Sequence, residues 1–257
     1  MAKTLDLVRL AEWQQYGWLR QAFSSRAGGV STVYGAAAYG DGALNLGWTR
    51  EDDPALVREN RARFLKEVNG ATPASLVTMR QVHGAEVVAV REVSEGLVGD
   101  GMMTGVQGLL LGIQTADCVP VLVVDVRQRV VAAIHAGWRG TVAGIAERGV
   151  ARMREEYGSR TEDLIAAVGP SIGACCYEVG EEVRGEFERA FKYGSELFEE
   201  GMRLDLWEAN RRQLAGAGVG RVTVVGECTG CSGRYFSYRK EGGVTGRMMS
   251  VVGVVQE

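Results

Sequence analysis

The sequence predicts an α+β fold in which a mixed β-sheet is covered by helices, an α/β sandwich. Eight short runs rich in Val, Leu and Ile are bounded by Gly, Pro or Asp, as β-strands are. Three of these runs follow one another without a helix between them, whereas others alternate with helical segments. Because both orders occur, we expect a mixed sheet instead of a purely parallel one.

The predicted elements follow from local signals. Strands are expected at residues 76–83, 86–91, 109–114, 119–126, 130–135, 164–168, 221–225 and 249–255. The clearest helix opens at Asp53-Pro54 and runs to about Val68, with Pro at its first position and Gly70 after its end. Further helices are expected at 142–156 behind a Thr141 cap, at 179–191, and at 206–214 behind Asp205.

Length and composition favour one globular unit. The chain has 257 residues, of which 46% are hydrophobic and 24% charged, and no linker divides it. A chain of this size buries a large core within one α/β domain. We therefore expect a single domain over residues 1–257.

Charge and cysteine content bound the partners. The net charge is −3 and the basic residues are scattered, so we expect no nucleic-acid binding. No apolar run reaches the length of a membrane span or of a signal peptide. Five cysteines, an odd number, agree with reduced thiols. These observations predict a cytoplasmic protein that binds small molecules, as a monomer or homodimer.

The rarest side chains predict a metal site. The chain has two histidines, His83 and His135, each in a glycine-flanked segment, and Cys118 lies between them. Two imidazoles and one thiolate suit zinc and leave a fourth tetrahedral position open; copper is the alternative metal. The ordinary interpretation is a satisfied histidine and a cysteine that packs as a small hydrophobe. Hydrophobic runs that end at Cys118 and His135 favour the metal, because strands deliver ligands at their carboxyl ends.

Charged residues beside these ligands suggest further roles. Arg139 lies in a glycine-rich loop between a strand and a helix, a ready site for phosphate or a carboxylate; the alternative is a tight turn with a solvated arginine. Asp100 and Asp117 are candidates for general acid or base. Alternation along a strand points Asp117 away from Cys118, unless the chain has already turned.

The remaining cysteines are expected to be structural. Cys175 and Cys176 are adjacent and favour packing over metal binding. Cys228 and Cys231 have the separation of half a zinc knuckle, but no second matching pair follows. We expect two thiols in a turn there, unless Cys175 and Cys176 fold against them.

Eight blocks, in order from about residue 22 to the end, carry a family resemblance. They are Ser25-Arg26-Ala-Gly-Gly-Val-Ser31, Leu44-Asn45-Leu-Gly47, Arg80-Gln81-Val-His83-Gly84, Thr115-Ala-Asp117-Cys118-Val-Pro-Val121, His135-Ala-Gly-Trp138-Arg139-Gly140, Gly169-Pro-Ser-Ile-Gly-Ala-Cys-Cys176-Tyr177-Glu-Val-Gly180, Asp205-Leu-Trp-Glu-Ala-Asn210-Arg211 and Phe236-Ser-Tyr238-Arg239. Together they resemble the YfiH family. Its proteins are often described as laccase-domain proteins or multicopper polyphenol oxidases, and members are now described as purine nucleoside phosphorylases.

The resemblance implies an α/β sandwich with zinc held at His83, Cys118 and His135. It also implies phosphorolysis of inosine, adenosine and S-methyl-5'-thioadenosine, giving the free base and ribose 1-phosphate or methylthioribose 1-phosphate. Members are credited with adenosine deamination as well. One departure is Gly99-Asp100-Gly101 in place of the more usual Ala-Asp-Ala, which leaves the role of Asp100 open. The matching blocks contain the substrate-binding candidates: Arg26, Asn45, Gln81, Tyr177 and Arg239.

Other functions compete with the zinc phosphorylase. A cysteine hydrolase would use Cys118 as nucleophile with His135 or His83 as base. A laccase needs several copper ions and far more than two histidines, so a copper-binding polyphenol oxidase is left with one copper at these three ligands. The third alternative is a binding protein without turnover.

Overall fold

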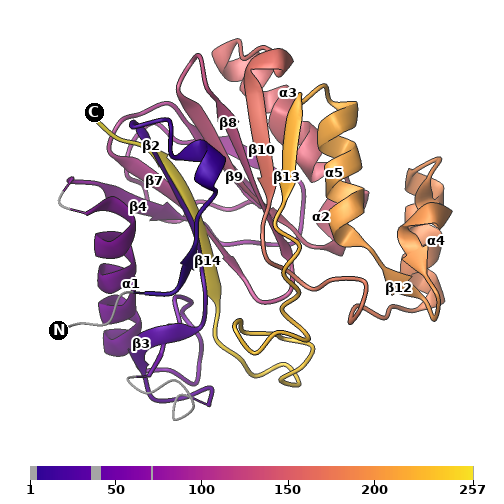
Figure 1. Cartoon of the computed structure of the whole chain (residues 1–257), viewed down its shortest axis with the longest axis horizontal. Coiled ribbons are helices and arrows are strands. Elements are labelled where there is room, and N and C mark those ends of the chain that lie inside the picture. The colour runs from indigo at the N-terminus through magenta and orange to yellow at the C-terminus, as the bar shows by residue number, and fades with distance from the viewer. Residues whose placement is uncertain (1–4, 36–41, 71, 257) are drawn as a thin grey trace.

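The computed structural model describes residues 5–35, 42–70 and 72–256, in which two β-sheets stack face to face and helices cover both outer faces (Figure 1). The first sheet has the order β1-β2-β14-β7-β4, and all its pairs are antiparallel except β4 with β7. Its strands are β1 (Leu7–Val8), β2 (Leu19–Ser24), β4 (Ser75–Thr78), β7 (Leu109–Thr115) and β14 (Met248–Val254). This sheet is therefore mixed.

The second sheet is mixed as well, with the order β13-β10-β8-β9-β6-β5. Its two edge pairs are parallel and its three central pairs antiparallel. The strands are β5 (Val87–Ala89), β6 (Gly101–Thr104), β8 (Val119–Asp125), β9 (Val130–Ala136), β10 (Leu164–Val168) and β13 (Arg221–Val224). β3 (Ala27–Ser31) lies outside both sheets, and β11 (Phe198–Glu199) pairs with β12 (Arg203–Leu204).

Buried residues on both faces of the central strands build the layers. Along β8, Leu122 and Val124 pack into the core between the sheets, whereas Val121 and Val123 pack into the core under the helices. Successive side chains of a strand point to opposite faces, so a strand in the middle of a sandwich is apolar throughout. This explains why the central strands were recognisable as continuous hydrophobic runs.

Helices close the two outer faces. On one side α1 (Pro54–Asn69) packs Phe64 and Val68 against the first sheet. On the other side α3 (Ile145–Tyr157) and α5 (Leu206–Gly216) cover the second sheet, with α2 (Trp138–Val142) beside them, and α4 (Glu181–Ala190) lies further out (Figure 1). Asp53 and Asp205 cap α1 and α5 by accepting backbone N–H bonds.

The structure confirms the fold class and corrects two details. The sequence predicted one mixed sheet, but the strands form two mixed sheets. In the first of them β14 pairs with β2 and β7, which lie far from it in the sequence. The helix predicted at 142–156 is also wrong at its start. Thr141 lies inside the short α2, and Gly144, in the left-handed region, precedes α3. Thr141 instead accepts a hydrogen bond from Asn210.

Within the described ranges, none of the helices combines the length and apolar character that crossing a bilayer requires.

Candidate active site

His135 is held by the pairing of β9 with β6. The first residue of β6, Gly101, pairs with Ile134, so the preceding residue, Asp100, lies beside His135. The His135 backbone N–H donates to the Asp100 carbonyl at 2.6 Å, and the His135 ring Nδ1 lies 2.8 Å from Asp100 Oδ1. Both side chains are buried. Asp100 thus fixes the ring and leaves Nε2 for another partner.

His83 is placed by the same carboxylate. It lies in the turn between β4 and β5 with a φ of 59°, a conformation that non-glycine residues adopt rarely. The backbone N–H groups of His83 and Gly84 donate to Asp100 Oδ1 and Oδ2 at 2.8 and 2.7 Å. One buried carboxylate therefore organises both histidines, whose rings lie 4.9 Å apart.

Cys118 lies in the turn between β7 and β8, immediately before β8 begins. The chain has already turned at Asp117, whose φ is 90°. Asp117 Oδ1 accepts from the Thr229 hydroxyl at 2.6 Å and Oδ2 from the Arg239 backbone N–H at 2.7 Å. With both oxygens engaged, Asp117 ties the Cys118 turn to the segment that follows β13.

The three predicted ligands meet in space. Donor atoms of His83, Cys118 and His135 all lie within 4.8 Å of one another. Burial opposes ionisation of the Cys118 thiol, but the neighbouring imidazoles outweigh it and lower its pKa. The same pairing, with Asp100, raises the pKa of His135 against the effect of burial. A thiolate between two imidazoles is a donor set that fits zinc or copper.

Glycine at position 137 permits this approach. A Cβ there would lie 3.2 Å from both Cys118 Sγ and His83 Cδ2 and 3.7 Å from His135 Cε1. The backbone between β9 and α2 therefore forms one side of the ligand group.

The ligand group opens into a cleft of about 1340 Å³. Carboxylates line part of the cleft. Its arginines and aromatic rings include Trp48, Arg61, Arg80, Tyr177, Tyr238, Arg239 and Arg247. Trp48 and Tyr238 are 53% and 54% exposed, so both rings are open to a ligand in the cleft. The cleft is large enough for a small-molecule ligand.

Arg61 is the cleft arginine with an unmet donor. Its Nε donates to the Leu46 carbonyl at 2.9 Å, and its guanidinium lies 4.5 Å from the centre of the Trp48 ring. Its Nη2 is buried without a hydrogen-bond partner among the residues described. Burial lowers the pKa of Arg61 to about 10, so the side chain is still a cation at neutral pH. A buried cationic donor at a cleft wall is suited to an anion.

The structure brings some predicted site residues to the cleft and places others behind it. Gln81, Asp117, Tyr177 and Arg239 line the cleft. Burial raises the pKa of Tyr177 to about 12, with the Cys118 thiolate as a further cause.

The other candidates support the fold around the cleft. Arg26 is buried and pairs with Glu241 at 2.7 Å. Asn45 is buried and bonds to Asp52 and to the backbone of Gly47 and Arg247. Arg139 is exposed over the Trp138 ring, outside the cleft lining. It lies inside the five-residue α2 helix, so the prediction that it lies in a loop before a helix is wrong.

Sequence reasoning missed several cleft residues. Arg61 lies on α1, where an arginine is usually solvated, and Trp48 and Tyr238 lie in loops. The sequence offers one local sign, the glycine before Trp48. In the structure a Cβ on Gly47 would meet the Arg247 side chain at 2.5 Å. This close approach brings the two loops together.

Comparison with known proteins gives concordant results. Residues 20–255 match the family model described as multi-copper polyphenol oxidoreductase laccase. A purine nucleoside phosphorylase of Deinococcus radiodurans is 44% identical over 91% of this chain and 88% of its own. Purine nucleoside phosphorylase YfiH of Escherichia coli is 34% identical over 95% and 97%.

Solved structures agree with the sequence relatives. The hypothetical protein YfiH of Bacillus licheniformis superposes with a TM-score of 0.87 at 30% identity, covering 99% of this chain and 98% of its own. YlmD of Geobacillus stearothermophilus gives a TM-score of 0.84 at 33% identity over 94% and 93%. The chain therefore belongs to the YfiH family, the group whose family model is described as multi-copper polyphenol oxidoreductase laccase.

Proposed function

We propose that this protein is a purine nucleoside phosphorylase that uses zinc at His83, Cys118 and His135. The observation that carries the proposal is the 44% identity, over 91% of the chain, to a protein of that name. The cleft supports it, because the three ligands open onto arginines for phosphate and exposed aromatic rings for a purine. We also propose that residues 1–257 act as one domain.

The reaction exchanges one bond at the ribose anomeric carbon. A phosphate oxygen forms a bond to C1' while the bond from C1' to the purine nitrogen breaks, and the bond electrons leave with the base. The purine gains a proton, and ribose 1-phosphate is the second product. Positioning the two reactants in one cleft lowers the entropic cost of their encounter.

Arg61 is our candidate for holding phosphate. Its unmet Nη2 supplies a charge-assisted hydrogen bond, and Arg80 and Arg247 add positive charge to the cleft. Trp48 and Tyr238 offer ring faces on which a purine can stack. The role predicted for Arg139 stays a prediction, and its exposed position makes Arg61 the stronger candidate.

Near the metal ligands, Tyr177 keeps its proton at neutral pH and is a neutral hydrogen-bond donor toward the base or ribose. A bound zinc ion would supply a Lewis acid that polarises a substrate oxygen or nitrogen. Asp100 holds the ring of His135 and the turn of His83 for that ion. Asp117 positions Arg239 through its backbone N–H.

The test is chromatographic detection of hypoxanthine from inosine, with zinc-loaded protein in the presence and absence of phosphate. We expect base release that requires phosphate and yields ribose 1-phosphate. Adenosine and S-methyl-5'-thioadenosine test the remaining substrates, and inosine formed from adenosine would reveal a deaminase. Base release without phosphate would contradict the proposal.

A cysteine hydrolase is the second candidate, favoured by the thiolate and imidazole pairing of Cys118 with His135. Metal distinguishes the two functions, because a metal-bound thiolate is a poor nucleophile. Chelation should abolish the phosphorylase and spare or activate the hydrolase. Copper in place of zinc is tested by measuring which metal co-purifies with the protein before zinc is added.

A further inference from the structure

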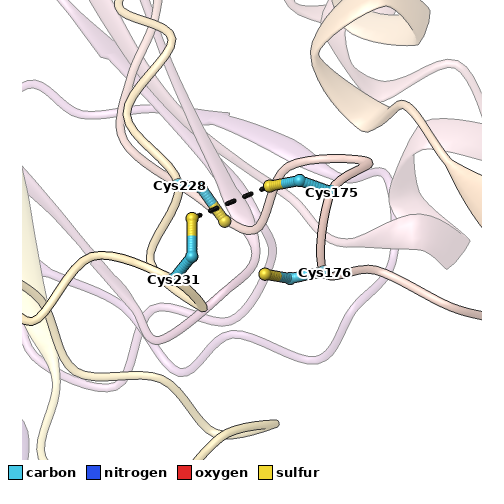
Figure 2. A group of neighbouring side chains, drawn as sticks. All are labelled: Cys175, Cys176, Cys228 and Cys231. Carbon is cyan, nitrogen blue, oxygen red and sulfur yellow. Dashed lines mark hydrogen bonds between the residues drawn. The ribbon is translucent and has the colours of Figure 1, made fainter.

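Four of the five cysteines converge on one point away from the three cleft ligands. Cys175 and Cys176 lie in the loop between β10 and α4, and Cys228 and Cys231 in the loop after β13. Figure 2 shows their side chains directed toward one another. All four sulfurs lie within 4.8 Å of one another, and none is in a disulfide.

The spacing of the sulfurs fits a single metal ion. Zinc bound to four thiolates has Zn–S bonds of about 2.3 Å, which separates the sulfurs of a regular tetrahedron by about 3.8 Å. The Sγ atoms of Cys175 and Cys231 lie 3.8 Å apart. A disulfide requires sulfurs at about 2.05 Å. Sulfurs this close together also suit one ion better than a polynuclear iron–sulfur cluster, whose thiolates bind different irons.

A backbone N–H group is directed at one of the four sulfurs. The Gly173 N–H donates to Cys228 Sγ at 3.3 Å. Hydrogen bonds from backbone N–H groups to sulfur stabilise the anionic form, the form that binds a metal.

Gly230 shows that the two loops are fitted closely at this point. A Cβ at Gly230 would lie 2.8 Å from Cys176 Cβ and 3.1 Å from Cys176 Sγ. Nearby backbone hydrogen bonds, from Ser171 to Glu227 and from Thr229 to Ser171, join the same two loops at 3.2 and 3.1 Å. The four thiols are therefore gathered by the backbone.

We propose that Cys175, Cys176, Cys228 and Cys231 form a second metal site, a closed four-thiolate zinc site with a structural role. Four protein ligands leave no position for substrate, which is the arrangement of structural zinc. From the sequence, Cys228 and Cys231 were expected to be two thiols in a turn unless Cys175 and Cys176 fold against them. In the structure Cys175 and Cys176 do fold against this pair. This second metal site does not depend on the proposed phosphorylase activity.

The four-cysteine site lies beside the loops that carry two cleft residues. Tyr177 follows Cys176 directly, and Thr229, between the other two cysteines, donates to Asp117. Asp117 in turn accepts from the backbone of Arg239, and Arg239 Nη1 donates to the Glu178 carbonyl at 2.7 Å. A zinc ion here would fasten the two loops that carry Tyr177 and Arg239 to the cleft wall.

Counting zinc in three proteins tests the proposal. The wild-type chain, Cys118→Ala and the double variant Cys175→Ser/Cys231→Ser are purified without chelator, incubated with three molar equivalents of zinc per chain, desalted and analysed by mass spectrometry of the elements. We expect two zinc ions per wild-type chain and one in each variant. Cys175 and Cys231 are exposed, so their replacement spares the core, and the zinc retained in the cleft reports that the double variant has folded.

A pair of glycine variants gives a second test that keeps all four thiols. Gly230→Ala should lower the affinity of the second zinc at least tenfold in a chelator competition, because its Cβ meets Cys176. Gly233→Ala is the matched control, since a Cβ there meets nothing within 4 Å. This pair decides the question if the double variant fails to fold.

Three results would overturn the proposal. One is a wild-type chain with a single zinc that Cys118→Ala loses and the double variant keeps. Another is iron, and not zinc, bound at the four cysteines of the wild-type chain as purified. The third is a Cys175 to Cys231 disulfide in freshly purified protein, seen as a mass two hydrogens lower before reduction.

Discussion

The cleft ligands and the four-cysteine site are both built from soft ligands brought together by loops, but they differ in donors and setting. His83, Cys118 and His135 provide three ligands beside a large cleft, with a buried carboxylate behind the two histidines. The four-cysteine site provides four thiols from two loops. Two of these thiols, Cys175 and Cys231, are exposed. A metal with three protein ligands keeps a coordination position open for water or substrate, which is typical of catalytic sites. A metal with four protein ligands is closed, which is typical of structural sites.

The comparison shows that the surroundings of the ligands distinguish the two sites. Asp100 gives the cleft histidines a fixed orientation, whereas the Gly173 N–H group and the close-fitting Gly230 shape the cysteine site. We therefore expect substitutions at the cleft ligands to act on turnover, and substitutions at the cysteine site to act on loop order and stability.

Replacing the cleft thiol in one protein and two thiols of the four-cysteine site in another should separate these effects most strongly. Cys118→Ala removes a proposed metal ligand. If the metal is lost with several kcal/mol of charge stabilisation, kcat/KM should fall by about 10³-fold or more. Cys175→Ser/Cys231→Ser should keep kcat within about tenfold while lowering the melting temperature by several degrees. Phosphorolysis assays and thermal melts measure both. Equal losses of kcat in the two proteins would break the distinction.

Asp100→Asn tests the carboxylate behind the cleft histidines. Loss of its charge should weaken metal binding or activity about 10- to 100-fold, as removing such a partner of a metal-bound histidine does. Asp125→Asn is the control, because Asp125 is equally buried but accepts from the backbone of Arg127 and Gln128 in a distant turn. Chelator competition on both proteins gives the affinities. A similar loss in Asp125→Asn would mean that Asp100 acts only through stability.

Arg61→Gln tests the proposed phosphate partner. A charge-assisted hydrogen bond contributes about 1.5–3 kcal/mol, which corresponds to a rise of about 10- to 100-fold in the KM for phosphate. The KM for inosine should change much less. Arg63→Gln, on the same helix and paired with Glu59 in solvent, should leave both constants unchanged. An unaltered phosphate KM in Arg61→Gln would exclude Arg61 from phosphate binding.

Tyr177→Phe should have the smallest effect. Because burial raises the pKa of Tyr177 to about 12, the phenol is neutral over roughly pH 6 to 9 and loses its proton only above that range. The variant should lose one hydrogen bond, a decrease of about 3- to 10-fold in kcat/KM, without a change in the shape of the pH profile. A wild-type alkaline limb that disappears in Tyr177→Phe would show that the phenol titrates in this range.

Local patterns were enough to predict the central strands, the α1 and α5 caps and the meeting of His83, Cys118 and His135. Buried strands, capped helices and rare histidines between glycines each leave a signal within a few residues. The prediction of a single domain and of a cytoplasmic location stays a prediction.

Other features depend on contacts between distant residues. Asp100 reaches His135 only because β6 pairs with β9 across 35 residues, and Cys175 meets Cys231 across 56. Asn45 and Arg26 occur in the family blocks, but the structure uses them to hold loops. Arg61 on an amphipathic helix has the local pattern of a solvated arginine. The Nη2 donor of Arg61 becomes buried only through tertiary packing, which the sequence pattern does not show.

The position of β14 has a consequence for how the protein is made. This strand is the latest in the sequence, yet it pairs with both β2 and β7 in the middle of the first sheet. During synthesis the first sheet cannot close until β14 has left the ribosome, and Asp117 cannot accept its bond from Arg239 until that residue has emerged. Such non-local pairing slows folding and leaves hydrophobic edges exposed in the nascent chain. Removal of the last ten residues should therefore be far more damaging than a surface-loop deletion of the same length.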